Sequence, residues 1–249
     1  MSDKVALITG AAAGIGAACS KRLARDGIAI GVLDLDQERC AATVEAIKAA
    51  SGRAVALGAD ISNRTQVKAA LDKLRATFGP ITILVNNAGI VDFSPFEQIT
   101  DDSWDRIFAV NVRGTFIVTQ EIVSDMKAKK WGRIVNISSS SAQTGAATLV
   151  HYSASKGAVI TLTRSLAQEL GPYGITVNNI PPGSVMNTVM SEANRHRFAI
   201  QADPSLSRNP VGRLGEPEDI ANACAWLCDE ATSYVSGQTI GVNGGRVVS

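Results

Sequence analysis

Short apolar segments alternate along the chain with longer segments in which apolar residues recur at helical spacing. Six short segments rich in β-branched residues are predicted to be buried strands, at residues 5–8, 28–33, 54–57, 81–85, 134–137 and 175–177. Between them, segments such as 15–25, 37–50 and 66–78 are predicted to be helices. Continuous apolar strands that alternate with helices favour an α/β fold, in which helices cover both faces of a parallel sheet.

The pattern does not divide the chain into parts. No linker, repeat or shift in composition interrupts the 249 residues, so we expect one domain over residues 1–249. Residues 181–210 depart from the alternation, with four prolines and little strand pattern. A long irregular segment in a compact domain is usually functional or mobile. We therefore expect residues 184–210 to form a lid over a substrate pocket, with a disordered loop as the alternative.

Composition and charge limit the classes of binding partner that we expect. The chain has 24 basic and 23 acidic residues, which gives no electrostatic reason to expect nucleic acid or an anionic membrane as a partner. The sequence shows no signal peptide and no apolar segment long enough to span a membrane, so a cytoplasmic protein is expected. Its four cysteines lack the spacing of a disulfide framework or a zinc site, and we expect buried thiols and no metal.

A glycine-rich turn follows the first predicted strand and opens the first predicted helix. It contains Gly10, Gly14, Ile15 and Gly16 in the spacing Gly-x3-Gly-x-Gly. Glycines let the backbone turn sharply and approach a pyrophosphate, while the N–H groups of the helix face the anion. Such a turn is a weak signal alone, but its position between strand and helix favours dinucleotide binding.

Asp34 ends the second predicted strand, eighteen positions after Gly16. An acidic residue there accepts hydrogen bonds from the adenosine ribose and repels the 2′-phosphate of NADP. No Arg or Lys stands in the glycine turn to bind that phosphate. We therefore predict NAD as the cofactor and regard NADP as disfavoured. The alternative interpretation is a surface acid that starts the next helix beside Asp36.

Tyr152 and Lys156 are four positions apart on a predicted helix and so share a face. A free tyrosine has a pKa of about 10, and a nearby ammonium group favours the phenolate and lowers that pKa. A phenol tuned in this way can exchange a proton with a reacting hydroxyl group. Ser139 lies thirteen positions earlier at a strand end, where its hydroxyl could hold the substrate oxygen. The alternatives are an exposed Tyr and Lys pair and a serine that caps a turn.

Taken together, these segments resemble the short-chain dehydrogenase/reductase family over nearly the whole chain. The matching pieces are Thr9-Gly10…Gly14-Ile15-Gly16, Asp60-Ile61, Asn86-Asn87-Ala88-Gly89, Asn111, Ser139, Tyr152…Lys156 and Pro182-Gly183. The resemblance implies a single Rossmann-type domain with a seven-stranded parallel sheet in the order 3-2-1-4-5-6-7. It also implies a homotetramer built partly from the helices that carry Asn111 and Tyr152.

The same resemblance assigns roles to individual residues. Tyr152 would be the proton donor and acceptor, Ser139 the substrate anchor and Lys156 a ligand of the nicotinamide ribose. Asn111 would distort its helix and hold a water that relays protons to Lys156. The implied cofactor-binding residues are Gly10, Gly14, Ile15, Gly16, Asp34, Leu35, Asp60, Ile61, Asn87, Gly89, Tyr152, Lys156, Pro182, Gly183, Val185 and Thr188. Asp60 and Ile61 would contact the adenine, and Val185 would lie near the nicotinamide amide.

Three positions depart from the family pattern or stand beside it. Thr188 lies one position further from Gly183 than is usual, so Ser184 and Asn187 are alternative contacts of the carboxamide. Asn243 replaces the aspartate of the C-terminal Val-Asp-Gly-Gly motif, near an expected subunit contact. His151 precedes Tyr152 and either tunes it or packs as a structural residue.

The predicted activity is the interconversion of a secondary alcohol and a ketone by hydride transfer to or from NAD, with a small, mostly apolar substrate. One alternative is the reduction of a 3-oxoacyl thioester carried by an acyl-carrier protein or coenzyme A. Another is a non-catalytic NAD-binding sensor, against which the complete Asn-Ser-Tyr-Lys set argues. A sugar-nucleotide epimerase shares the Tyr-x3-Lys pair but usually has a longer chain.

Overall fold

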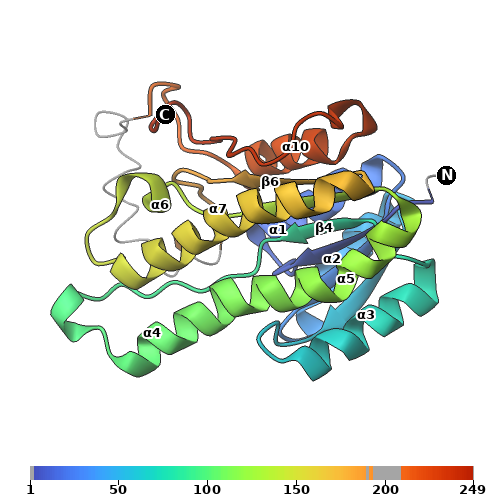
Figure 1. Ribbon diagram of the computed structural model, residues 1–249, viewed down its shortest axis with the longest axis horizontal. Helices are drawn as coiled ribbons and strands as arrows, with labels where there is room; N and C mark the ends of the chain where they lie inside the picture. The colour runs from blue at the N-terminus through green and yellow to red at the C-terminus, as the bar shows by residue number, and fades with distance from the viewer. Residues whose placement is uncertain (1–2, 189–190, 193–208, 249) are drawn as a thin grey trace.

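The computed structural model describes residues 3–188, 191–192 and 209–248. Most of the predicted lid, residues 184–210, therefore lies outside the described residues. The chain builds one parallel sheet with helices on both sides (Figure 1). In the part of the chain that is described, no helix is long and apolar enough to cross a membrane.

Within the described ranges, six strands form the sheet in the order β3-β2-β1-β4-β5-β6, and every pair is parallel. This order confirms the first six positions of the predicted topology. The chain reverses its direction of winding between β1 and β4, which places a crevice at the carboxyl ends of these two strands. The strands are β1 (Val5–Thr9), β2 (Ala29–Asp34), β3 (Ala54–Gly58), β4 (Ile83–Asn86), β5 (Gly132–Ile137) and β6 (Ile175–Ile180).

The prediction of a seventh strand is wrong for the described residues. Residues 238–242 run parallel to the end of β6 but form only isolated bridges, Asn179 with Thr239 and Pro182 with Val242. Asn179 donates its N–H to the carbonyl of Gln238 and accepts from the N–H of Ile240. The next ladder position on this side is Pro181, which has no N–H to donate. The ladder is therefore interrupted where a continuous strand was expected.

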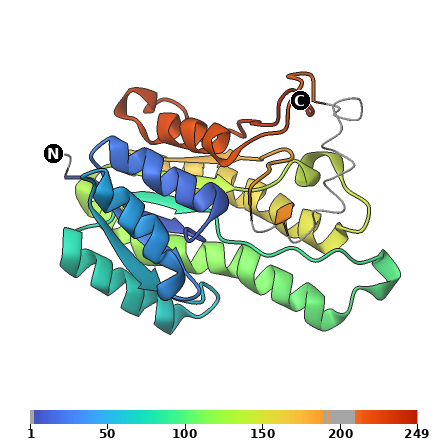
Figure 2. The same ribbon diagram turned by 180° about the vertical axis from the view of Figure 1, so that it is seen from behind.

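Side chains alternate across each strand and build two cores. Ala6 and Ile8 of β1 belong to one core, and Val5 and Leu7 belong to the other. The first core packs under α1 (Gly14–Arg25), α2 (Ala41–Ala49) and α10 (Pro217–Cys228), which face the viewer in Figure 2. The second packs under α3 (Arg64–Phe78), α5 (Thr115–Lys129) and α7 (Val150–Leu170), which face the viewer in Figure 1.

The remaining helical segments are short or extend these helices. α4 (Asp101–Phe108) continues through η3 (Ala109–Gly114) into α5, and α6 (Ser141–Thr144) precedes α7. The others are η1 (Glu38–Cys40), η2 (Phe96–Gln98), η4 (Gly171–Tyr173) and η5 (Glu230–Thr232). All four cysteines are buried free thiols, as predicted.

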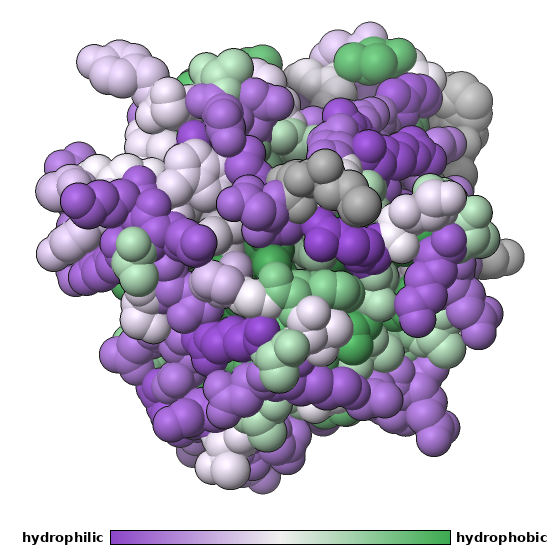
Figure 3. Space-filling view, turned by 90° about the vertical axis from the view of Figure 1, so that its right-hand side faces the viewer, coloured by the Kyte–Doolittle hydropathy of each residue, from purple (hydrophilic) through white to green (hydrophobic). Residues whose placement is uncertain are grey.

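The candidate site lies at one end of the molecule, where the strands finish. Figure 3 shows the end at the right of Figure 1, near the N-terminus, where hydrophilic side chains cover most of the surface and apolar ones gather near the centre. α6 and the first turn of α7 lie at the opposite end, at the left of Figure 1. The strands finish towards that second end, and the candidate site lies there.

Candidate active site

A cavity of about 930 Å³ follows the carboxyl ends of the strands. Its wall combines the glycine turn, the ends of β2, β3, β4 and β5, the start of α7 and the segment after β6. The residues predicted for the site that line it are Gly10, Gly14, Ile15, Asp34, Leu35, Asp60, Ile61, Asn87, Gly89, Ser139, Tyr152, Lys156, Pro182, Gly183, Val185 and Thr188. Two predicted residues, Gly16 and Asn111, do not line the cavity and act from behind its wall.

The glycine turn is held in shape by backbone geometry. Gly10 and Gly14 have φ angles of +63° and +54°, a conformation that disfavours side chains. A Cβ on Gly16 would lie 2.3 Å from the carbonyl oxygen of Gly10, so only glycine lets α1 begin this close to the turn. The Asn87 amide donates to the carbonyls of Thr9 and Gly10 over 2.9 and 3.0 Å. Asn87 therefore fixes the turn from the neighbouring strand.

These features fit the diphosphate of a dinucleotide. The N-cap of α1 is Ala13, and no side chain of the described residues caps the N–H groups of this helix, which leaves them available to an anion. Thr188 stands across the turn, since a Cβ on Gly14 would lie 3.3 Å from the Cβ of Thr188. Further along the wall, the buried hydroxyl of Ser138 has no hydrogen-bond partner among the described residues. The cavity thus offers both a cradle and an unpaired polar atom to a bound cofactor.

Asp34 lies at the end of β2 with its carboxylate against the turn. Its oxygens accept hydrogen bonds from the backbone N–H groups of Ala12 and Leu35 over 3.2 and 2.9 Å. Arg39, from η1, approaches the same carboxylate to 3.4 Å and also lines the cavity. Arg39 lies outside the glycine turn in sequence and was not predicted; the short helix after β2 brings it back to Asp34.

Asp60 and Ile61 follow β3 on the same side of the cavity. The Asp60 carboxylate accepts hydrogen bonds from the N–H and the hydroxyl of Ser62, over 2.8 and 2.7 Å. Ile61 is buried and packs under Gly114, where a Cβ would lie 2.7 Å from the Ile61 side chain. Asp60, Ile61 and Leu35 all line the cavity.

Tyr152 and Ser139 meet on the other side of the cavity. Only 7% of the Tyr152 surface is exposed, which excludes the alternative of an exposed residue on a helix. Burial raises the pKa of Tyr152, and a hydrogen bond from Ser139 lowers it in part. The spacing of Tyr152 and Lys156 predicts a lowered Tyr152 pKa, and this direction is wrong because the effect of burial outweighs that of the Ser139 hydrogen bond. Ser139 also contacts Ser141, with 2.9 Å between the two hydroxyl oxygens.

Lys156 lies one turn further along α7 and is 4% exposed. Its Nζ is 5.9 Å from the centre of the Tyr152 ring and donates a hydrogen bond to the carbonyl of Ile137 over 3.0 Å. Burial lowers the pKa of Lys156 to about 8. The ammonium group is consequently charged at neutral pH and close to losing its proton in mild alkali.

Asn111 lies in the π-helical segment η3, between α4 and α5. Its side chain exchanges hydrogen bonds with the backbone N–H and carbonyl of Ile90, over 2.9 and 3.0 Å, and donates to Ser155 over 3.0 Å. A Cβ on Gly89 would lie 3.1 Å both from Asn111 Oδ1 and from Lys156 Nζ. Asn111 therefore ties the cavity wall after β4 to the helix of Tyr152 and Lys156.

His151 is fully buried and does not line the cavity. Its Nε2 lies 3.3 Å from Ser103 Oγ and 3.4 Å from Asp92 Oδ2, while its Nδ1 has no partner among the described residues. The hydrogen bond from Ser103, together with the contact with His151, lowers the pKa of Asp92. His151 thus joins α7 to α4 and to the segment after β4.

Arg246 is a second cation of the cavity wall that was not predicted from the sequence. This residue lines the cavity and donates a hydrogen bond to Ser184 over 2.8 Å. The two residues are far apart in sequence, and no spacing in the chain indicates the contact. Ser184 therefore faces the C-terminal segment, and Thr188 lines the cavity despite its unusual distance from Gly183.

The arrangement is that of a dinucleotide-dependent oxidoreductase: a phosphate cradle at one end of a cavity and a Ser, Tyr and Lys cluster at the other. A family profile described as short chain dehydrogenase matches residues 4–198. The chain therefore belongs to the short-chain dehydrogenase/reductase family.

Individual relatives are similar over their whole length. A (2S)-[(R)-hydroxy(phenyl)methyl]succinyl-CoA dehydrogenase subunit from Thauera aromatica is 40% identical over 99% of this chain and 97% of its own. A 3-oxoacyl-[acyl-carrier-protein] reductase from Aquifex aeolicus is 36% identical over 98% of both chains. The crystal structure of a short-chain type dehydrogenase/reductase from Mycobacterium marinum superimposes with a TM-score of 0.93 at 31% identity, covering 100% of this chain and 97% of that one.

Family membership establishes the general activity. The protein is an oxidoreductase that acts on hydroxyl or keto groups, and members of the family use nicotinamide cofactors. Its relatives include reductases and dehydrogenases of acyl thioesters.

Proposed function

We propose that the protein interconverts a secondary alcohol and a ketone with NAD, and that Tyr152 donates and accepts the proton. The main support for this proposal is the environment of the Tyr152 phenol. It is buried in the cavity wall, accepts a hydrogen bond from Ser139 and has the Lys156 ammonium group beside its ring. When bound, the nicotinamide cofactor supplies or takes up the hydride.

Each side chain of the cluster has a distinct task in this proposal. Tyr152 keeps its proton at neutral pH because burial raises its pKa, so it is ready to donate to a ketone oxygen. Ser139 holds that oxygen by a hydrogen bond and stabilises the developing negative charge. The Lys156 ammonium favours the phenolate that remains after proton donation. Asn111 keeps Gly89 and Ser155 in place around Lys156.

The NAD preference rests on Asp34. Its partly buried carboxylate stands against the glycine turn, where it would accept hydrogen bonds from the ribose and repel a 2′-phosphate. Arg39 weakens this repulsion, since a cation that can turn from Asp34 to a phosphate lies within 3.4 Å. We therefore propose NAD as the better cofactor, with a margin that depends on how firmly Asp34 retains Arg39.

A second candidate activity is the reduction of 3-oxoacyl thioesters. It is favoured by the names of the relatives, which include a 3-oxoacyl-[acyl-carrier-protein] reductase and an acetoacetyl-CoA reductase. Both activities use the same proton chemistry at Tyr152 and differ only in what the outer part of the cavity binds.

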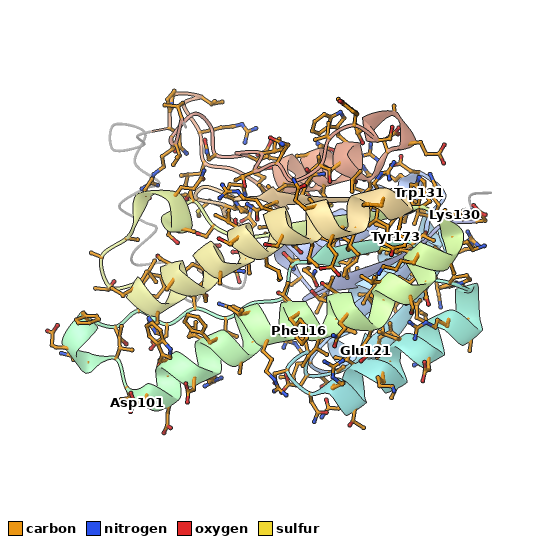
Figure 4. The ribbon with its side chains drawn as sticks, in the orientation of Figure 1. Asp101, Phe116, Glu121, Lys130, Trp131 and Tyr173 are labelled. Carbon is orange, nitrogen blue, oxygen red and sulfur yellow. The ribbon has the colours of Figure 1, made fainter. Side chains whose placement is uncertain are left out.

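We also propose a homotetramer and one domain over residues 1–249. Two large aromatic side chains are partly exposed on α5 and after α7, where a contact between subunits would form. Phe116 on α5 and Tyr173 after α7 are each 43% exposed, and Figure 4 shows both on the face towards the viewer. Aromatic side chains are enriched at protein–protein interfaces relative to the rest of the surface.

The test is a panel of secondary alcohols, ketones and 3-oxoacyl thioesters assayed with NAD and NADP, or with their reduced forms. Absorbance of the reduced nicotinamide reports turnover. We expect ketones and alcohols to react, with NAD ahead of NADP. Turnover restricted to thioesters establishes the second activity instead, and faster turnover with NADP contradicts the role of Asp34.

A further inference from the structure

The C-terminal segment forms part of the cavity wall. Gly183 donates its N–H to the carbonyl of Val242 over 3.2 Å, and a Cβ on Gly183 would lie 3.0 Å from the Cα of Asn243. The two segments are therefore packed backbone to backbone. Arg246 and Val247, which follow, line the cavity together with Ser184 and Val185.

Asn243 folds this segment so that Arg246 reaches the cavity. Its buried amide accepts a hydrogen bond from the N–H of Gly245 over 3.0 Å and donates to the carbonyl of Val247 over 3.1 Å. A carboxylate cannot donate, so an aspartate at this position would lose the contact with Val247. The asparagine that departs from the family pattern thus stabilises the turn that carries Arg246.

The Arg246 guanidinium has N–H donors that are not used within the described residues. One nitrogen donates to Ser184 Oγ over 2.8 Å, and no carboxylate lies within ion-pair distance of the group in the part of the chain that is described. The Arg213 guanidinium is by contrast held by both carboxylate oxygens of Asp219, over 2.6 and 2.7 Å. An exposed arginine that is held by one guanidinium nitrogen, with its other N–H donors unpaired among the described residues, is suited to bind an anion through two parallel hydrogen bonds.

The charges of the cavity wall are unevenly distributed. Among the described residues that line it, the only acids are Asp34 and Asp60, which follow β2 and β3 beside the glycine turn. The wall near Tyr152 contains Lys156, and the segment that carries Arg246 packs on the wall after β6. Ser140, next to Ser139, donates its N–H to the carbonyl of Pro182 over 3.0 Å, which joins the wall after β6 to the Tyr152 wall. The described residues that line these two walls include Lys156 and Arg246 and no carboxylate, so they favour a negatively charged ligand.

We propose that Arg246 binds an anionic group of the substrate, such as a carboxylate, at a distance from the reacting carbon. This inference rests on the proposed function and defines its substrate class as oxo acids or hydroxy acids rather than neutral ketones and alcohols. Ser184 is a positioning residue, which holds the guanidinium at the edge of the cavity.

The experiment compares 3-oxobutanoate, 4-oxopentanoate and 5-oxohexanoate with their methyl esters, which differ in one charge. The assay measures kcat/KM with NADH for the wild type, Arg246→Met, Arg246→Lys and the control Arg25→Met, an exposed residue of α1 outside the cavity. The wild type should prefer at least one acid to its ester. Arg246→Met should lower that preference by roughly 10- to 100-fold, as expected for loss of a charged hydrogen bond. Arg246→Lys should retain part of it, and Arg25→Met all of it.

Binding provides a readout that is independent of turnover. The fluorescence of bound NADH, titrated with each acid, gives dissociation constants even for an acid that does not react. Equal preference for acid and ester in the wild type and in Arg246→Met overturns the proposal, as does an effect of Arg246→Met on the KM of NADH alone. If none of the acids or esters is reduced, the proposed function fails for these substrates. Arginine-dependent binding of the acids then still supports the anion site.

Discussion

The two ends of the cavity are built in different ways. At the glycine turn the shape is set by backbone, because Gly10 and Gly14 have positive φ angles and Gly16 admits no Cβ. At the Tyr152 end it is set by side chains that come from α7, from β5 and from the C-terminal segment. The first end fits a group that all members of the family bind, and the second fits a substrate that differs between them. A backbone cradle tolerates few substitutions, whereas a wall of side chains can change one residue at a time.

Gly16→Ala should have the largest effect at the glycine turn. The new Cβ would lie 2.3 Å from the carbonyl oxygen of Gly10 and must push α1 away from the turn. We expect NADH to bind roughly 100-fold more weakly and the free energy of unfolding to fall by about 1–3 kcal/mol. Fluorescence titration and urea unfolding measure the two effects. Gly171→Ala is the matched control, because a Cβ there meets nothing within 4 Å; equal behaviour of both variants would refute the steric argument.

Asp34→Ala should invert the cofactor preference at the same end. The substitution removes the ribose contacts and frees Arg39, 3.4 Å away, to meet a 2′-phosphate. The ratio of kcat/KM for NAD to that for NADP should fall about 10- to 100-fold. Asp36→Ala, two positions further on and outside the cavity, should leave the ratio alone. If the ratio is insensitive to Asp34, the basis for NAD selection lies elsewhere.

Lys156, at the Tyr152 end of the cavity, makes the free energy of unfolding depend on pH. The folded protein releases the Lys156 proton near pH 8, whereas the unfolded chain holds it to about 10.5. Between these values the unfolded state binds more protons, so this group makes the protein more stable as the pH rises. Urea unfolding at several pH values should show that the wild type gains about 1–3 kcal/mol relative to Lys156→Met across this window. A difference that stays constant or shrinks would mean that Lys156 is not buried in its charged form.

His151→Ala should have the smallest effect on turnover. His151 contacts Ser103 and Asp92 behind the cavity wall, and its loss should cost about 1–3 kcal/mol of unfolding free energy. His151→Gln retains an N–H donor and should recover part of this stability. Calorimetric melting and kcat are measured together. A large fall in kcat without a fall in stability would instead give His151 a direct part in the reaction.

How far the sequence predicts this molecule also differs between the two ends. The six strands and the glycine turn follow from apolar periodicity and from glycine, because both reflect local backbone rules, whereas the strand order follows only from the family resemblance. The absence of a seventh strand among the described residues shows the limit of family resemblance, because Pro181 lacks the N–H that a continuous ladder needs.

The Tyr152 end of the cavity is only partly predictable from the sequence. The spacing of Tyr152 and Lys156 places them on one face, but their burial, which raises the Tyr152 pKa and lowers that of Lys156, depends on the whole fold. The contacts of Arg39 with Asp34 and of Arg246 with Ser184 are set by how loops return to the sheet, and no local pattern encodes that.

The most direct test of the account is Tyr152→Phe, which removes one oxygen and leaves the ring. With NADH and a ketone that the wild type reduces, kcat should fall by about 10²- to 10⁴-fold. The NADH dissociation constant, measured by fluorescence, should stay within about threefold, because the glycine turn is untouched. Tyr234→Phe, at a fully exposed position, should match the wild type in both measurements. A Tyr152→Phe enzyme with kcat within about tenfold of the wild type would contradict the central claim that this phenol moves the proton.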